Sequence, residues 1–67
     1  MRIDFADNLK NLRLEAKLTQ SKLAKSLNIT QRKVSYLENG IIEPSLNDLW
    51  SIADFFNLSI DELLGRK

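Results

Sequence analysis

The sequence contains no cysteine and no histidine among its 67 residues. Without cysteine, the chain can form neither a disulfide bond nor a thiolate metal site. Without histidine, it lacks the commonest general base and the commonest metal ligand. The composition therefore predicts a protein that holds no metal or cofactor and is not an enzyme.

Glycine and proline are also scarce, with two glycines and one proline, whereas apolar residues make up 43% of the chain. This composition suits a compact helical core, and no strand pattern or repeat interrupts it. No apolar run approaches the ~18 residues of a membrane span. The N-terminal stretch is too acidic to be a signal peptide. We expect one all-α domain over residues 1–67, in the cytoplasm.

Charge is unevenly distributed, although the net charge is only +1. Residues 17–33 contain five basic residues and no acidic one: Lys17, Lys22, Lys25, Arg32 and Lys33. Residues 34–67 contain six acidic and two basic residues. A basic block beside an acidic one is typical of a face that binds a polyanion. A lysine-rich face that is merely solvated is the alternative, and charge by itself leaves both open.

Apolar spacing and capping residues predict a first helix that Asp4 caps. Its apolar side consists of Phe5, Leu9, Leu12 and Ala16, and its exposed side carries Lys10, Arg13 and Glu15. Thr19 is a suitable N-cap for a second helix with the apolar stripe Leu23, Ala24 and Leu27. That helix is predicted to end at Asn28, because asparagine tolerates the left-handed conformation.

Thr30 is the predicted cap of a third helix, Gln31–Asn39, which Gly40 ends. Its apolar stripe is thin, since only Val34 and Leu37 contribute. Ile29, in the tight turn before it, is expected to fill the crevice between helices. Glu38 is expected to pair with a cation, and Arg13 is the candidate.

Two further helices follow, each with a capping box. Ser45 and Asp48 begin the fourth, whose predicted core stripe is Leu46, Leu49, Ile52, Ala53 and Phe56. Ser59 and Glu62 begin a short fifth helix with Ile60, Leu63 and Leu64, and Gly65 ends it. The adjacent carboxylates Asp61 and Glu62 point about 100° apart and do not form a catalytic pair.

Only three residues separate the second and third helices, and this spacing is typical of a helix-turn-helix. A helix with two apolar anchors and a long polar face is poorly explained as a core element. It is well explained as a helix that projects into a groove.

These segments resemble the lambda-repressor-like helix-turn-helix domain of Cro and repressor proteins. The resemblance lies in Leu18-Thr19-Gln20, Leu23-Ala24, Leu27-Asn28-Ile29-Thr30, residues 34–40, Pro44-Ser45, Ile52-Ala53 and residues 58–63, and it covers roughly residues 5–64. Asn28 stands where the family often has glycine. Ile41-Ile42-Glu43 stand where relatives often carry Lys or Arg, so few phosphate contacts are expected from that loop.

The resemblance implies a compact five-helix fold and binding of double-stranded DNA. The residues at base-reading positions are Gln31, Arg32, Ser35 and Tyr36. The residues at DNA-backbone positions are Lys17, Thr19, Gln20, Thr30, Lys33 and Asn39. Glutamine suits an adenine edge and arginine a guanine edge, whereas phosphate contacts fix register without reading sequence.

Large apolar residues off the fourth-helix stripe indicate an interface. Phe55, with Trp50, Ile60 or Leu64, is our candidate for a two-fold dimer contact, which would place two recognition helices on a pseudo-palindromic site. The leading hypothesis is therefore a bacterial or phage-derived transcriptional regulator, most simply a repressor. The rival is a protein-interaction or antitoxin-type module of the same fold with little DNA binding of its own.

Overall fold

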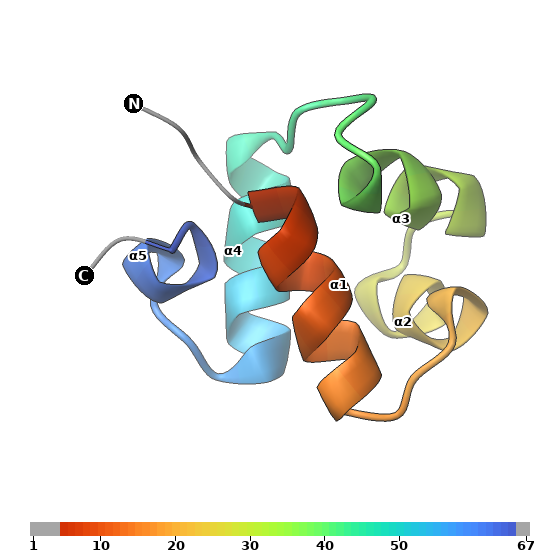
Figure 1. Ribbon diagram of the computed structural model, residues 1–67, viewed down its shortest axis with the longest axis horizontal. Helices are drawn as coiled ribbons and strands as arrows, with labels where there is room; N and C mark the ends of the chain where they lie inside the picture. The colour runs from red at the N-terminus through yellow and green to blue at the C-terminus, as the bar shows by residue number, and fades with distance from the viewer. Residues whose placement is uncertain (1–4, 66–67) are drawn as a thin grey trace.

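The computed structural model describes residues 5–65, and these residues form five α-helices, as the sequence predicted. The helices are α1 (Phe5–Glu15), α2 (Gln20–Leu27), α3 (Gln31–Glu38), α4 (Leu46–Phe56) and α5 (Ile60–Leu63) (Figure 1). α3 ends one residue earlier than predicted, because Asn39 is its C-cap. The all-α, five-helix class is confirmed.

Four of the five helices begin at the residues that the sequence indicated. The side chains of Thr19, Thr30, Ser45 and Ser59 each accept a hydrogen bond from the backbone N–H three residues later. Asp48 and Glu62 return the bond and complete capping boxes. The predicted cap Asp4 lies outside the described residues.

The ends of α1, α2, α3 and α4 share one geometry. Each is followed by a residue with positive φ: Lys17 (59°), Asn28 (58°), Gly40 (69°) and Asn57 (57°). The next N–H then bonds a carbonyl five residues back, as Ile29 does to Ala24 at 2.9 Å, which closes the helix in a Schellman motif. Asn28 and Gly40 confirm the predicted turns, whereas Lys17 carries no local signal for this conformation.

The core is built from all five helices. Its buried apolar residues are Phe5, Leu9, Leu23, Ala24, Val34, Leu37, Ile52, Ala53 and Leu63. Leu12, Leu27, Ile29, Leu49 and Phe56 are half-buried against them. Two predicted core positions are wrong. Leu46 is 66% exposed, since it is the first residue of α4 beside an exposed loop, and Asp48 and Leu49 face the rest of the molecule instead. Ala16 lies in the exposed turn after α1.

α1 is the element that joins the two halves of the molecule. It contacts α3 on one side and α5 on the other. In Figure 1, α2 and α3 consequently lie to one side of α1, and α4 and α5 lie to the other. α2 also packs against α4, which ties the halves together beneath α1. This arrangement leaves the outer face of α3 uncovered.

Candidate nucleic-acid interface

α2 and α3 are joined by a turn of three residues, Asn28, Ile29 and Thr30. Asn28 takes the left-handed conformation, and Ile29 packs against the core as predicted. Val34 and Leu37 are the buried apolar residues of α3, with exposed fractions of 0% and 1%. α3 is therefore anchored on one narrow side, as a helix-turn-helix requires.

The polar side of α3 faces outward. Gln31, Arg32 and Tyr36 are exposed, and Ser35 is half-buried. At the end of the helix, the Asn39 amide nitrogen donates to the Ser35 carbonyl at 2.8 Å and lies 3.3 Å from the Ser35 hydroxyl. The Asn39 backbone N–H also donates to the Ser35 carbonyl, at 3.0 Å. The predicted base-reading residues thus share one face, with Asn39 at its end.

The first turns of α2 and α3 contain no acidic residue, and each carries a lysine at its third position. These are Lys22 and Lys33. A helix N-terminus has unpaired N–H groups and a partial positive charge. Here that charge stands beside lysines, and no carboxylate in the first turn of either helix neutralises it. Lys33 is itself paired with Asp48 of α4. Thr19 and Thr30 accept the capping bonds and keep their own hydroxyl hydrogens available to donate.

A chain of hydrogen bonds connects the buried end of α3 to its exposed beginning. Arg13 Nε lies 2.6 Å and Arg13 Nη2 3.1 Å from the two oxygens of Glu38. Gln20 Nε2 donates to Glu38 Oε1 at 3.1 Å, and Gln31 Nε2 donates to Gln20 Oε1 at 3.2 Å. We call these four side chains the amide relay. Three helices contribute to it.

The relay confirms one expectation and corrects another. The predicted pairing of Glu38 with Arg13 is confirmed. The prediction that Arg13 lies on the exposed side of α1 is wrong, since Arg13 is only 9% exposed. α3 packs against α1 and brings Glu38 onto Arg13. The third nitrogen of Arg13 donates to the Leu18 carbonyl at 2.9 Å. A buried charge is tolerated when it is paired and fully hydrogen-bonded.

Lys33 lies at the inner edge of the same face and holds a second ion pair. Its ammonium is 2.8 Å from Asp48 Oδ1 on α4. Burial by itself would raise the pKa of Asp48, but the bonds from Lys33 and from the backbone and hydroxyl of Ser45 lower it below its ordinary value of 3.8. Lys33 still has two ammonium hydrogens beyond the one given to Asp48.

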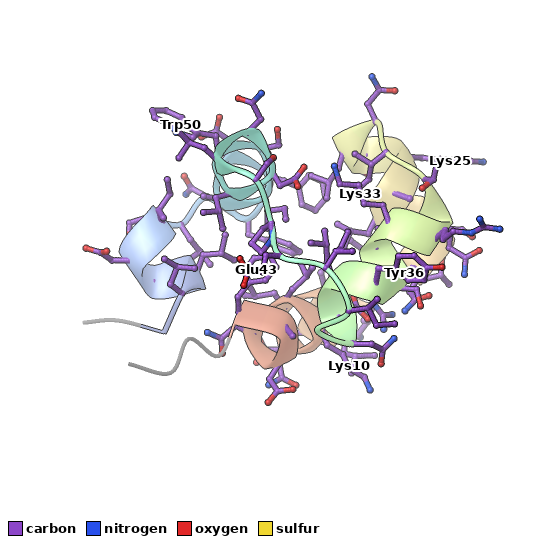
Figure 2. All side chains as sticks on the ribbon, turned by 90° about the horizontal axis from the view of Figure 1, so that it is seen from above. Lys10, Lys25, Lys33, Tyr36, Glu43 and Trp50 are labelled. Carbon is purple, nitrogen blue, oxygen red and sulfur yellow. The ribbon has the colours of Figure 1, made fainter. Side chains whose placement is uncertain are left out.

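The dimer candidates lie away from this face. Trp50 is 56% and Phe55 42% exposed, whereas Ile60 and Leu64 are half-buried against the core. Figure 2 shows Trp50 on the outer side of α4, away from Lys25 and Tyr36, with Lys33 between them. Five positions on a helix correspond to about 140° of rotation, so Trp50 and Phe55 lie on different flanks of α4.

Within residues 5–65, no three carboxylates lie close enough together to hold a metal ion. None of the helices in this range is long and apolar enough to cross a membrane.

A sequence profile of the helix-turn-helix family matches residues 9–63. The chain belongs to this family, in its lambda-repressor-like branch. A curated relative, the HTH-type transcriptional activator BcrR of Enterococcus faecalis, is 37% identical over 63 residues, which are 94% of this chain and 31% of the relative.

Solved structures agree with this assignment. A crystal structure of a transcriptional regulator from Listeria innocua has a TM-score of 0.92 and 37% identity, and it aligns over 100% of this chain and 63% of that chain. The P22 c2 repressor, solved with a synthetic operator, has a TM-score of 0.86 over 100% of both chains at 21% identity, and shows the same fold. This chain thus spans less than two thirds of the BcrR and Listeria proteins.

Proposed function

We propose that this protein regulates transcription by binding double-stranded DNA at a specific sequence, with α3 in the major groove. The observation that carries the proposal is the polar outer face of α3, placed beside two helix N-termini that lack carboxylates. The basic residues of positions 17–33 lie on α2, on α3 and in the turn before α2. Such an arrangement attracts phosphates and leaves the side chains of α3 to read base edges.

Each side chain on the face has a chemical role in this proposal. Gln31 reads adenine, Arg32 reads guanine, and Ser35 and Tyr36 contact neighbouring base edges or a thymine methyl group. The DNA-backbone contacts come from Lys17, Thr19, Gln20, Thr30, Lys33 and Asn39. The backbone N–H and the side-chain amide of Asn39 both bond Ser35, so a phosphate contact from Asn39 would use the amide hydrogen that lies toward the Ser35 hydroxyl at 3.3 Å.

Selection of bound sequences from a random duplex pool tests the proposal. We expect one half-site to be enriched, and affinity for it to fall steeply with added salt because bound counterions are released. If the chain enriches no sequence and does not bind random duplex DNA at low salt, it does not bind DNA by this face. That result would favour the rival, a protein-interaction or antitoxin-type module.

We also propose a homodimer that reads a pseudo-palindromic site. The exposed aromatic residues of α4 support it, since large exposed apolar side chains mark interfaces. Because Trp50 and Phe55 lie on different flanks, Trp50→Asp and Phe55→Asp separate the two possible dimer surfaces. We expect one variant to sediment as a monomer where the parent is dimeric. If both variants sediment like the parent, neither flank is the dimer surface.

Repression is the direction of regulation that we propose, because a bound domain blocks a promoter simply by occupying it. The family also contains a protein named as an activator, so a reporter assay is needed. Expression should fall when the selected site overlaps the promoter. We further propose that the protein is not an enzyme, acts in the cytoplasm, and is bacterial or phage-derived.

A further inference from the structure

We propose that the buried Arg13–Glu38 pair determines which base Gln31 prefers, by fixing the direction in which two glutamine amides donate. This inference rests on the proposed function, because it concerns how α3 reads DNA. Arg13 and Glu38 are 9% and 6% exposed and would not touch the nucleic acid. They act as positioning residues through the amide relay.

The first step is the orientation of Gln20. The Arg13 guanidinium only donates hydrogen bonds, and it holds both oxygens of Glu38. An ionised carboxylate only accepts. Gln20 can therefore bond Glu38 only through its amide nitrogen, as it does at 3.1 Å. The Gln20 amide oxygen is left facing α3.

The second step passes this orientation to Gln31. The Gln20 oxygen accepts from Gln31 Nε2 at 3.2 Å. If the Gln31 amide were flipped, two oxygens would meet at that distance with no hydrogen between them. Gln31 therefore keeps one N–H on Gln20 and presents its other N–H together with its own oxygen to the solvent.

That outward pair matches adenine and opposes guanine. In the major groove adenine offers the acceptor N7 beside the donor N6, whereas guanine offers two acceptors, N7 and O6. With Gln31 oriented by the relay, its oxygen would face O6 of guanine with no hydrogen to share. A buried ion pair on the far side of Gln20 thus selects adenine over guanine.

Glu38→Gln should reverse the relay. The shortest bond in the network joins Glu38 Oε2 to Arg13 Nε at 2.6 Å, so we expect the new amide oxygen to keep that place. The new nitrogen then faces Gln20, and the bond that Oε1 accepts from Arg13 Nη2 at 3.1 Å is given up. Gln20 then turns its oxygen to residue 38 and its nitrogen to Gln31. Gln31 must accept with its oxygen and present both N–H groups outward, which suits guanine.

The test uses the full chain and a selected half-site. The base pair that Gln31 reads is the one at which Gln31→Ala loses its sequence preference. Two duplexes are then synthesised, with adenine or guanine at that position. We expect the parent to prefer adenine by about 5- to 150-fold. In Glu38→Gln the preference should fall at least about fivefold and move toward guanine. Glu43→Gln makes the same change in an exposed loop, and the preference should be unchanged.

A second variant covers the case in which Glu38→Gln does not fold. Gln20→Met keeps the length of the half-buried side chain and removes its amide, so Gln31 is no longer oriented. The ratio of affinities for the adenine and guanine duplexes should then fall toward 1 without reversing in favour of guanine. A purely structural role would weaken binding to both duplexes equally and leave their ratio unchanged. If the folded variants keep the full adenine preference, the relay does not set specificity. If the parent itself enriches no site, the proposed function fails as well.

Discussion

The two helix pairs on either side of α1 differ in how their N-termini are satisfied. α2 and α3 are capped by threonine, and a lysine follows three residues after each cap. α4 and α5 are capped by serine, and Asp48 and Glu62 stand at the corresponding positions. A carboxylate at this position neutralises the positive end of the helix. The first turns of α4 and α5 are thus neutralised by their own carboxylates. The first turns of α2 and α3 contain no carboxylate, although Lys33 of α3 is paired with Asp48, so an external anion can satisfy the positive charge at the start of α2.

The difference teaches that stability and binding make opposite demands on a helix N-terminus. A capping box stabilises a helix but occupies its N–H groups and cancels its charge. In this protein the capping boxes occur in α4 and α5, and they are absent from the pair that carries the candidate interface.

Removing one carboxylate from each half should give the largest contrast. Glu38→Ala leaves the buried Arg13 without its partner, which should lower the free energy of unfolding by about 3–5 kcal/mol. Glu62→Ala removes an exposed capping contact and should cost about 1 kcal/mol or less. Urea denaturation followed by circular dichroism measures both. Equal losses would show that the ion pair contributes no more than a cap.

Arg32→Ala should affect binding and leave folding unchanged. The side chain is exposed on α3, so the free energy of unfolding should change by less than about 0.5 kcal/mol. Affinity for the selected site should fall by about 1–3 kcal/mol, with relaxed preference at one base pair. Lys25→Ala removes an exposed lysine of α2 and is the control. Its loss of DNA affinity should be smaller and the same for all sequences. Unchanged affinity in Arg32→Ala would mean that the proposed register on DNA is wrong.

Lys22→Glu makes the start of α2 resemble those of α4 and α5, because Thr19 and residue 22 would then form a capping box. We expect the free energy of unfolding to rise by up to about 1 kcal/mol, whereas the affinity for DNA should fall. Lys22→Gln can form the same box without the negative charge, so it should weaken binding less. Denaturation and titration of the selected duplex check the two effects. If Lys22→Glu binds DNA as well as the parent, the start of α2 does not face phosphate.

Asp48→Asn should give the smallest effect, and one that depends on pH. The pKa of Asp48 is lowered in the folded chain, so its ionised form stabilises the fold above the unfolded-state value. That contribution is lost as the pH falls through 3.8 and then through the lower pKa of the folded state. We expect Asp48→Asn to be less stable than the parent by about 0.5 kcal/mol at neutral pH. The two should converge in acid, as urea denaturation at several pH values would show; a constant difference would contradict this.

Local chemistry explains why most of the fold could be predicted from the sequence. The caps at Thr19, Thr30, Ser45 and Ser59 need only a bond to a residue three positions away. The turns at Asn28 and Gly40 need only a residue that accepts positive φ. Such contacts depend on neighbouring residues alone, so the residue types indicate them directly.

The errors arose where distant elements decide the environment. Periodicity placed Arg13 on the exposed side of α1, because a charged residue off the apolar stripe is normally solvated. Periodicity likewise placed Leu46 in the core, although this first residue of α4 is exposed and α3 contacts the same turn through Asp48. The spacing of apolar residues describes a helix by itself and contains no information about which other elements pack against it.

The sequence by itself determined the five helices, the capping residues of α2 to α5, the short turn between α2 and α3, and the concentration of basic residues between positions 17 and 33. Only the tertiary structure decided that Arg13, Glu38, Gln20 and Gln31 meet in one hydrogen-bonded relay. The physical reason is distance along the chain, since Arg13 and Glu38 are 25 residues apart. Their contact exists only because α3 packs against α1 at that point.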